Sequence, residues 1–260
     1  MAENSVHARR LEGKTAIVTG ASRGIGLAVA RRLVTEGARV CITARKPGPL
    51  AEAAASFPEG SVLAIAGKSD DAEHRAEVLD AVAAEFGRLD ILVNNAGINP
   101  VYGPLMDLEP EAARKIIEVN LYGTLGWVQA AYHHEKLDFA GRGGSVINLS
   151  SVSAQTPSPG ISFYGISKAA IEQLTRSLAV ELGPAIRVNA LAPAVVKTQF
   201  ARALYEGREE QVAAAYPLGR LGAPEDVAAA AAFLASDDAA WITGQILNLD
   251  GGLLAAGGNA

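Results

Sequence analysis

The sequence predicts a single α/β domain, a doubly wound parallel sheet of about seven strands flanked by helices. Short apolar runs recur along the chain, and runs that are apolar on both faces are typical of buried parallel strands. Helical patterns alternate with these runs, as the crossovers between parallel strands require. The 260 residues suffice for one large domain, and no internal repeat or linker divides them.

The first expected strand, residues 15–19, ends in a glycine-rich turn that leads into a helix reaching residue 36. The turn reads Gly20-Ala21-Ser22-Arg23-Gly24-Ile25-Gly26. Strand, turn and helix together form the phosphate-binding half of a dinucleotide-binding Rossmann fold. Gly20 would permit the tight turn, Gly24 would admit a pyrophosphate, and Gly26 would let helix and strand pack closely. A loop that is merely glycine-rich is the alternative, and its flanking elements argue against it.

The end of the second expected strand, residues 39–43, bears on the choice of cofactor. An acidic residue at this point would bind the ribose 2′-hydroxyl of NAD(H). Ala44 stands there instead, and Arg45 and Lys46 follow. With Arg23, these cations would attract a 2′-phosphate. The sequence therefore favours NADP(H), with NAD(H) possible, although Arg45 and Lys46 would also suit an ordinary solvated loop.

The middle of the chain continues the alternation. Strands are expected at residues 61–66 and 90–93, with an amphipathic helix at 71–86 between them and a long helix at 110–133. Asn94-Asn95-Ala96-Gly97 follows the fourth strand and falls at the carboxyl edge of the sheet, where ligands of such folds bind. The long helix carries Asn120, and an isolated helical asparagine is usually a solvated or packing residue.

Three further side chains are expected to meet at the same edge. A strand at residues 145–149 runs into Ser151, and a helix at 162–182 carries Tyr164 and Lys168 one turn apart on one face. A nearby ammonium would lower the phenol pKa from about 10. Such a phenol would exchange a proton with a carbonyl or alcohol oxygen, with Ser151 beside it. The alternative is an exposed Tyr and a solvated Lys.

The last third of the chain completes the domain. A strand at residues 187–191 leads into the stretch 193–198, which should border the cofactor. Residues 199–216 interrupt the alternation and suit a substrate lid. A helix at 224–235 and a strand at 245–249 follow. We expect residues 1–12 to form an N-terminal arm and residues 13–260 the single domain.

Composition narrows the possible partners and locations. The net charge of −5 argues against nucleic acid, and the single cysteine rules out an internal disulfide. No signal peptide and no membrane-spanning run is visible, so a cytoplasmic protein is expected. His133-His134 lacks further residues at metal-ligand spacing, and no metal is expected.

These motifs, in this order and over nearly the whole length, resemble the short-chain dehydrogenase/reductase family, with the 3-oxoacyl-thioester reductase-like branch as the nearest type. The matching residues are Thr19-Gly20-x-x-x-Gly24-x-Gly26, Asn94-Asn95-Ala96-Gly97, Asn120, Ser151, Tyr164-x-x-x-Lys168, Pro193 with Thr198, and Asp250-Gly251-Gly252.

The resemblance implies a role for each residue. Tyr164 would be the acid/base, Ser151 would position the carbonyl, Lys168 would hold the nicotinamide ribose and tune Tyr164, and Asn120 would keep a water in the proton relay. The residues implied to bind the cofactor are Gly20, Ser22, Arg23, Gly24, Ile25, Gly26, Arg45, Lys46, Asn94, Ala96, Gly97, Tyr164, Lys168, Pro193, Val196 and Thr198.

The leading hypothesis is an NADPH-dependent carbonyl reductase, plausibly for 3-oxoacyl thioesters, assembled as a homotetramer or homodimer. An alcohol, sugar or steroid dehydrogenase working in the oxidative direction is the alternative, because the same residues serve both directions. A non-catalytic NADP-binding regulator is a remote third, since such proteins generally lose Ser151, Tyr164 or Lys168. Three departures from the family pattern are Lys68-Ser69, where an acid and an apolar residue are usual, Ala194 in place of glycine, and a slightly longer connection at residues 133–144. The first departure puts the usual adenine contact in doubt, and Lys68 could instead lie near the phosphate.

Overall fold

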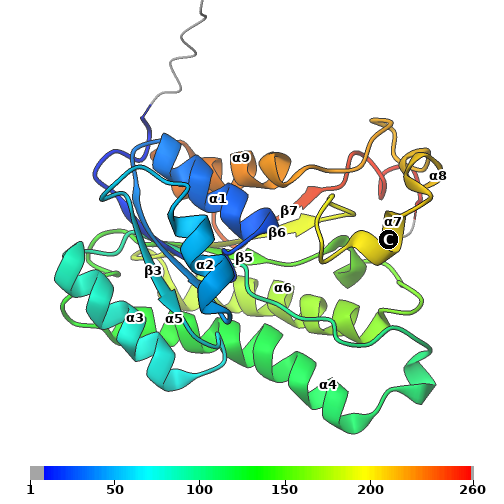
Figure 1. Cartoon of the computed structure of the whole chain (residues 1–260), viewed down its shortest axis with the longest axis horizontal. Coiled ribbons are helices and arrows are strands. Elements are labelled where there is room, and N and C mark those ends of the chain that lie inside the picture. Colours follow the sequence, from blue (N-terminus) through cyan, green and yellow to red (C-terminus); the bar gives the residue numbers. More distant parts are fainter. Residues whose placement is uncertain (1–8, 259–260) are drawn as a thin grey trace, which may run out of the picture.

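The structure, a computed structural model, describes residues 9–258 and contains one seven-stranded sheet (Figure 1). All neighbouring strands run parallel, in the order β3-β2-β1-β4-β5-β6-β7. The strands are β1 (Thr15–Val18), β2 (Arg39–Ala44), β3 (Val62–Ala66), β4 (Ile91–Asn94), β5 (Ser145–Leu149), β6 (Arg187–Pro193) and β7 (Ile246–Leu249). The expected doubly wound α/β fold is confirmed.

Helices cover both faces of this sheet. One face carries α1 (Gly24–Thr35), α2 (Pro47–Ala54) and α9 (Pro224–Ala235). The other carries α3 (Ala72–Glu85), α5 (Gly123–His133) and α6 (Ser162–Leu182), with α4 (Pro110–Ile117) leading into α5. Short helices α7 (Arg202–Tyr205) and α8 (Glu209–Ala213) follow β6. No helix in the described part of the chain has both the length and the apolar character needed to cross a lipid bilayer.

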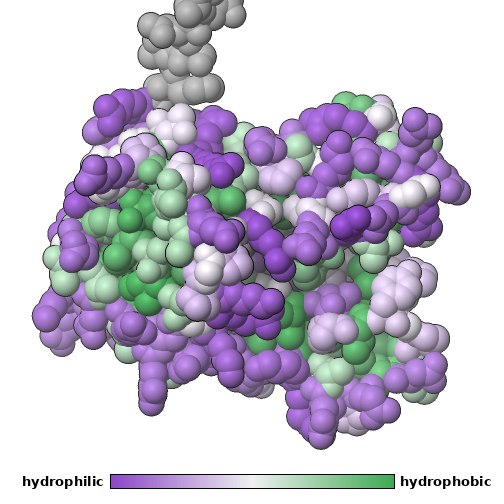
Figure 2. All heavy atoms as spheres, in the orientation of Figure 1, coloured by the Kyte–Doolittle hydropathy of each residue, from purple (hydrophilic) through white to green (hydrophobic). Residues whose placement is uncertain are grey.

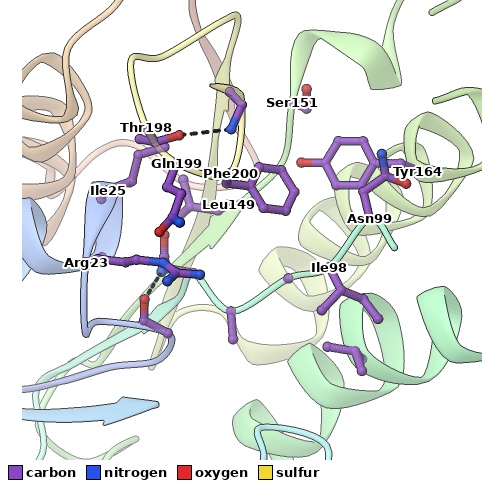
Figure 3. Close-up of a pocket in the computed structure, with 18 of the residues that line it drawn as sticks. Arg23, Ile25, Ile98, Asn99, Leu149, Ser151, Tyr164, Thr198, Gln199 and Phe200 are labelled. Atoms are coloured by element: carbon purple, nitrogen blue, oxygen red, sulfur yellow. Dashed lines mark hydrogen bonds between the residues drawn. The ribbon is translucent and has the colours of Figure 1, made fainter. Parts of the chain in front are cut away.

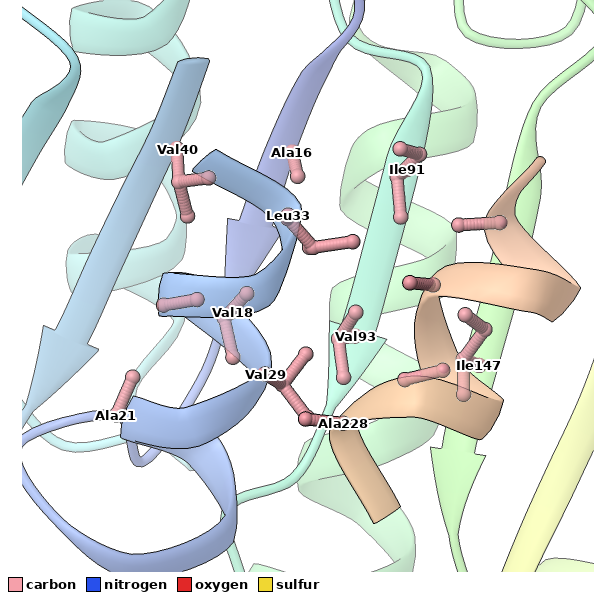
Figure 4. Close-up of a cluster of buried hydrophobic side chains, with 14 of the residues drawn as sticks. Ala16, Val18, Ala21, Val29, Leu33, Val40, Ile91, Val93, Ile147 and Ala228 are labelled. Carbon is pink, nitrogen blue, oxygen red and sulfur yellow. The ribbon is translucent and has the colours of Figure 1, made fainter. Parts of the chain in front are cut away.

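The two faces have separate cores because successive strand residues point to opposite sides. Ala16 and Val18 of β1 pack under α1 and α9, whereas Ile17 between them packs with α3 and α5 on the other side. Figure 4 shows the first of these cores, with Val29 of α1 and Ala228 of α9 lying over the strands. Ala30 of α1 and Ala228 of α9 are buried in this core, and such small side chains let the two helices lie close together.

The expected elements match the structure closely, and two differ in an informative way. The long helix expected at residues 110–133 is interrupted by a π-helical turn, Glu118–Tyr122, with Asn120 at its centre. The strand expected to end at residue 191 continues to Pro193, because Ala192 and Pro193 pair with the last strand. Both departures lie at the carboxyl edge of the sheet, where the side chains of interest gather.

The chain outside the sheet layers is also packed. Leu11 is fully buried, and Arg10 forms ion pairs with Glu36 and Asp238, so the described end of the expected arm belongs to the domain. Residues 1–8 of that arm lie outside the described residues. In the expected lid, Tyr205 and residues of α8 pack on a small cluster that includes Tyr216 and Leu253. The lid therefore rests on its own apolar cluster, apart from the two cores of the sheet.

Candidate active site

A cavity of about 560 Å³ opens at the carboxyl edge of the sheet. Its walls come from the glycine turn, the ends of β2 to β6, the start of α6 and the lid. Fifteen of the sixteen residues expected to bind a dinucleotide line this cavity, as does Ser151. They are Gly20, Ser22, Arg23, Gly24, Ile25, Gly26, Arg45, Lys46, Ala96, Gly97, Tyr164, Lys168, Pro193, Val196 and Thr198. Segments far apart in the sequence thus meet at one site.

Gly20 and Gly26 of the glycine turn have no room for a side chain. A Cβ on Gly26 would lie 2.5 Å from Asn95 Nδ2 and 2.7 Å from the carbonyl oxygen of Gly20. Gly20 itself has φ +66°, which favours glycine. Asn95, which follows the neighbouring strand β4, holds the turn in place. Its Nδ2 donates to the carbonyl oxygens of Thr19 (2.8 Å) and Gly20 (3.1 Å). A backbone cradle of this kind, opening into the first turn of α1, fits a diphosphate.

Four cations line the end of the cavity next to this turn. They are Arg23, Arg45, Lys46 and Lys68, and the side chain of none of them forms a hydrogen bond or an ion pair within residues 9–258. One acid, Asp70, lines the same end and is paired with Lys115. That pairing lowers the pKa of Asp70 against the opposing effect of its partial burial. This end of the cavity therefore carries positive charge without a protein partner, which suits an anionic ligand.

The other end of the cavity carries the reactive hydroxyl groups. In Figure 3 the Tyr164 hydroxyl points into the cavity near Ser151 and Phe200, while Arg23 lies across the view. Ser151 Oγ accepts from Ser153 N (3.2 Å) and Ser153 Oγ (2.9 Å), and it is also a hydrogen-bond partner of Tyr164. Two hydroxyl groups thus point at one place from β5 and α6. A substrate oxygen there would receive two hydrogen bonds.

Lys168 does not lower the pKa of Tyr164 in this structure, and the expectation that it does is wrong. Burial raises the Tyr164 pKa above its ordinary value, and the hydrogen bond from Ser151 offsets this only in part. The Lys168 ammonium lies 5.4 Å from the centre of the Tyr164 ring and donates to the carbonyl oxygen of Leu149 at 2.6 Å. Burial lowers the pKa of Lys168 to about 8. Desolvation outweighs the attraction between the two groups.

Asn94 and Asn120 are the two expected site residues that do not line the cavity. Asn94 Nδ2 donates to Asn148 Oδ1 (3.0 Å) between neighbouring strands, so its side chain braces the sheet and does not face a ligand. Asn120 Oδ1 accepts from Ile98 N (2.8 Å), and its Nδ2 donates to Ile98 O (3.1 Å) and Ser167 Oγ (3.0 Å). Its side chain therefore fixes the loop after β4 to α6.

Apolar side chains surround the hydroxyl end. The Phe200 ring from the lid lies 6.0 Å from the Tyr164 ring, centre to centre. Tyr102, from the loop after β4, packs on Gly160, where a Cβ would fall 2.6 Å from its ring, and Gly103 N donates to Gly160 O (3.0 Å). Figure 2 shows apolar side chains exposed between the regions of α7 and α4. Lys168 is the charged residue that this end contributes to the cavity lining.

Sequence reasoning missed several residues that shape the site. Ser153 supports Ser151, and Thr19 Oγ1 accepts from Asn95 N (3.1 Å) and Ala96 N (3.0 Å). The sequence held a signal for Thr19: it is a polar residue at the end of the first strand, and Asn94-Asn95 stand at the end of the fourth. The Leu149 carbonyl that receives Lys168 had no signal, since every residue carries a carbonyl. No group of three or more His, Cys, Asp or Glu side chains in residues 9–258 is arranged to hold a metal ion.

Comparisons with known proteins agree with this geometry. The family described as "Enoyl-(Acyl carrier protein) reductase" matches residues 20–254. The chain is 39% identical over 260 residues to "Dehydrogenase/reductase SDR family member 4" of Caenorhabditis elegans, covering 95% of this chain and 97% of the relative. It is 37% identical over 250 residues to "Tropinone reductase-like 3" of Erythroxylum coca, covering 94% of each. A solved "Short-chain dehydrogenase/reductase SDR:Glucose/ribitol dehydrogenase" from Brucella melitensis superposes with TM-score 0.87 at 29% identity, covering 94% and 98%.

Proposed function

Because this chain belongs to the short-chain dehydrogenase/reductase family, whose oxidoreductases act on carbonyl and alcohol groups, we propose that it is an NADPH-dependent carbonyl reductase. The observation that carries the proposal is the pair of hydroxyl groups of Ser151 and Tyr164 at one end of a cavity whose other end is a diphosphate cradle. A ketone placed between them would become a secondary alcohol.

The residues divide the chemistry of the reduction among them. When bound, the nicotinamide supplies the hydride that reaches the carbonyl carbon. Ser151 donates a hydrogen bond that orients the carbonyl oxygen, and Tyr164 delivers its proton to that oxygen as negative charge develops there. Lys168 would hold the nicotinamide ribose from the floor of the cavity, where the Leu149 carbonyl fixes its ammonium. Asn120 does not line the cavity and contributes by fixing the loop after β4 through its hydrogen bonds with Ile98.

Burial raises the pKa of Tyr164 and so favours its protonated form, which is the form that a reduction uses. A phenol whose pKa lies above its ordinary value stays protonated at neutral pH, so it is ready to donate a proton. Removing a proton from an alcohol would first require the phenolate, which burial disfavours. The oxidative alternative, a dehydrogenase for an alcohol, sugar or steroid, uses the same residues and is favoured where alkaline conditions or substrate supply shift the equilibrium.

The preference for NADP(H) over NAD(H) is supported by charge. Arg23, Arg45 and Lys46 line the adenosine end of the cavity, and no acid follows β2. An acid at that point would bind a ribose 2′-hydroxyl and repel a 2′-phosphate, whereas guanidinium groups bind phosphate well. NAD(H) remains a possible second cofactor, to be measured alongside.

The substrate end of the cavity supports a neutral, apolar carbonyl compound. Phe200, Leu204 and Tyr102 lie on its walls, and among residues 9–258 no charged side chain other than Lys168 comes from this end. A carboxylate-bearing substrate would find no cation beyond the catalytic group itself. A 3-oxoacyl thioester fits this class through its acyl chain, and simple alkyl or aryl ketones fit it as well.

The experiment that tests the proposal follows NADPH absorbance with a panel of 3-oxoacyl thioesters, free ketones and sugars. The proposal expects turnover with apolar ketones or thioesters and little with sugars, and NADPH preferred to NADH. Turnover only of alcohols with NADP⁺ would establish the oxidative alternative. Tight NADPH binding without turnover of any substrate would establish the non-catalytic regulator instead.

We also propose that the protein self-associates and works in the cytoplasm. A homotetramer, or a homodimer, is supported by large apolar side chains on the surface, with Trp241 99% and Val180 83% exposed. Light scattering coupled to gel filtration measures the assembly, and a monomer at micromolar concentration would contradict it. A cytoplasmic location is tested by fractionation of cells that express the tagged chain.

A further inference from the structure

A lysine outside the expected cofactor residues stands beside the cations at the end of β2. Register pairs Ala44 of β2 with Ala66 of β3, and Gly67 N donates to the carbonyl oxygen of Ala44 at 3.0 Å. Arg45 and Lys46 follow the end of β2, and Gly67 and Lys68 follow the end of the neighbouring strand β3. Parallel strands that end together present their next residues to the same edge, so Lys68 lines the same end of the cavity as Arg45.

The backbone around Lys68 is held in place from several sides. Trp127 Nε1 donates to Ser69 Oγ (2.9 Å), and Arg75 Nη1 donates to the carbonyl oxygen of Ser69 (3.2 Å). The buried ring of His74 occupies the space next to Gly67, where a Cβ would lie 2.2 Å from it. Side chains of α3 and α5 thus fix the residues on both sides of Lys68. The backbone of Lys68 therefore has a defined position at this end of the cavity.

The charge on Lys68 is left for a ligand. Its side chain forms no hydrogen bond and no ion pair with the part of the chain that the structure describes. Asp70 is near enough for Lys68 to influence it, but Lys115 from α4 pairs directly with that carboxylate. The acid at this end is therefore already compensated, and Lys68 adds to the unpaired positive charge of Arg23, Arg45 and Lys46.

We infer that Lys68 is a specificity-determining residue that binds the 2′-phosphate of NADP(H), together with the cations that follow β2. The inference rests on the proposed function, which places a phosphorylated dinucleotide in the cavity. The adenosine ribose of a dinucleotide lies at the end of the second strand in this fold, because the pyrophosphate is held at the start of the first helix. Lys68 follows the end of the adjoining strand and lines the same cavity as Arg23 and Arg45.

Binding measured by calorimetry separates this role from general electrostatics. The ligands are NADPH and NADH, and adenosine 2′,5′-bisphosphate and 5′-AMP, each pair differing by the 2′-phosphate. Lys68→Ala should weaken the phosphorylated member of each pair about tenfold, the loss of one charge-assisted contact. The unphosphorylated member should change less than about twofold, because an exposed charge acts weakly at a distance. Lys68→Glu should weaken the phosphorylated members further.

The matched control is Lys136→Ala. Lys136 is another exposed lysine without an ion pair among residues 9–258, and it lies away from the cavity. It should leave all four affinities unchanged. If wild type prefers NADPH but Lys68→Ala weakens both members of a pair equally or neither, the inference about Lys68 is wrong and the proposed function stands. If wild type itself binds NADH as tightly as NADPH, the proposed cofactor preference fails and the inference fails with it.

Discussion

The ammonium of Lys168 lies 2.6 Å from the carbonyl oxygen of Leu149 and donates a hydrogen bond to it. This contact joins the first turns of α6 to the last residue of β5, so the amine is held at the edge of the sheet. It also means that the amine is occupied by the backbone and not by the Tyr164 hydroxyl. The fixed amine and the hydroxyl of Tyr164 then face the cavity from one helix, with Ser151 on the neighbouring strand end.

The pH dependence of cofactor capture should report Lys168. Burial lowers its pKa to about 8, so the ammonium loses its proton as the pH rises through that value. The kcat/KM for NADPH reflects ionisations of the free enzyme and should fall above pH about 8. In Lys168→Arg the guanidinium keeps its charge, so the alkaline fall should move upward or disappear. Lys136→Arg is the control. If kcat/KM of Lys168→Arg fell at the same alkaline pH as that of the wild type, the fall would belong to a group other than Lys168.

The same shift affects stability with a defined sign. The folded pKa of Lys168 lies below its ordinary value of 10.5, so between about pH 8 and that value the unfolded chain binds more protons. Stability rises with pH wherever the unfolded state binds more protons. The contribution of Lys168 to the free energy of unfolding should therefore increase from pH 8 to pH 10, and Lys168→Met should remove that increase in denaturant titrations at the two pH values.

Tyr164→Phe removes the proton donor and leaves the ring in place against Phe200. We expect kcat for ketone reduction to fall by about 10²–10⁴, the usual contribution of a positioned acid. The Kd for NADPH, measured by fluorescence, should stay within about twofold because no charge is lost. Tyr132→Phe, an exposed tyrosine away from the cavity, should keep full activity. Normal turnover in Tyr164→Phe would remove this residue from the mechanism.

Tyr102 should set the size of ketone that the cavity accepts. Its ring packs on Gly160, just before α6, and lines the cavity. Tyr102→Ala should raise the ratio of kcat/KM for bulky over small ketones by roughly tenfold, since a pocket discriminates mainly by the space it offers. Tyr102→Phe keeps the ring and should leave the ratio unchanged. An unaltered ratio in Tyr102→Ala would place the size limit elsewhere.

Gly26→Ala should damage the phosphate cradle. The added Cβ would lie 2.5 Å from Asn95 Nδ2, and this amide holds the turn through the carbonyl oxygens of Thr19 and Gly20. Overpacking of this kind costs about 1–3 kcal/mol in the free energy of unfolding. Affinity for NADPH should fall by about tenfold or more as the cradle shifts. Denaturant titration and calorimetry measure the two effects.

Gly48→Ala is the matched control for Gly26→Ala. A Cβ on Gly48 would meet no atom within 4 Å, and its φ is not positive. The free energy of unfolding there should stay unchanged or rise by less than about 1 kcal/mol, because alanine restricts the unfolded chain. If both variants behaved alike, close packing at Gly26 would not be the reason for glycine at that position.

The sequence by itself determined the elements and their order. Runs such as residues 15–18 and 145–149 are apolar on both faces, and that property is local, so it can be recognised without tertiary structure. The expected helices 162–182 and 224–235 have the same limits in the structure, because the turns and proline around them are local signals too. The glycine turn was also recognisable, since its backbone demands glycine at fixed spacings.

Only the tertiary structure decided what each side chain meets. The sheet order places β4 between β1 and β5, so Asn95 reaches the glycine turn after β1 while Asn94 is bound to Asn148 of β5. A π-helical turn aims Asn120 at Ile98, and the end of β3 brings Lys68 beside Arg45. Burial raised the pKa of Tyr164 against the expectation from its spacing to Lys168. Spacing along a chain fixes local geometry, whereas desolvation and contacts between strand ends depend on how distant segments pack.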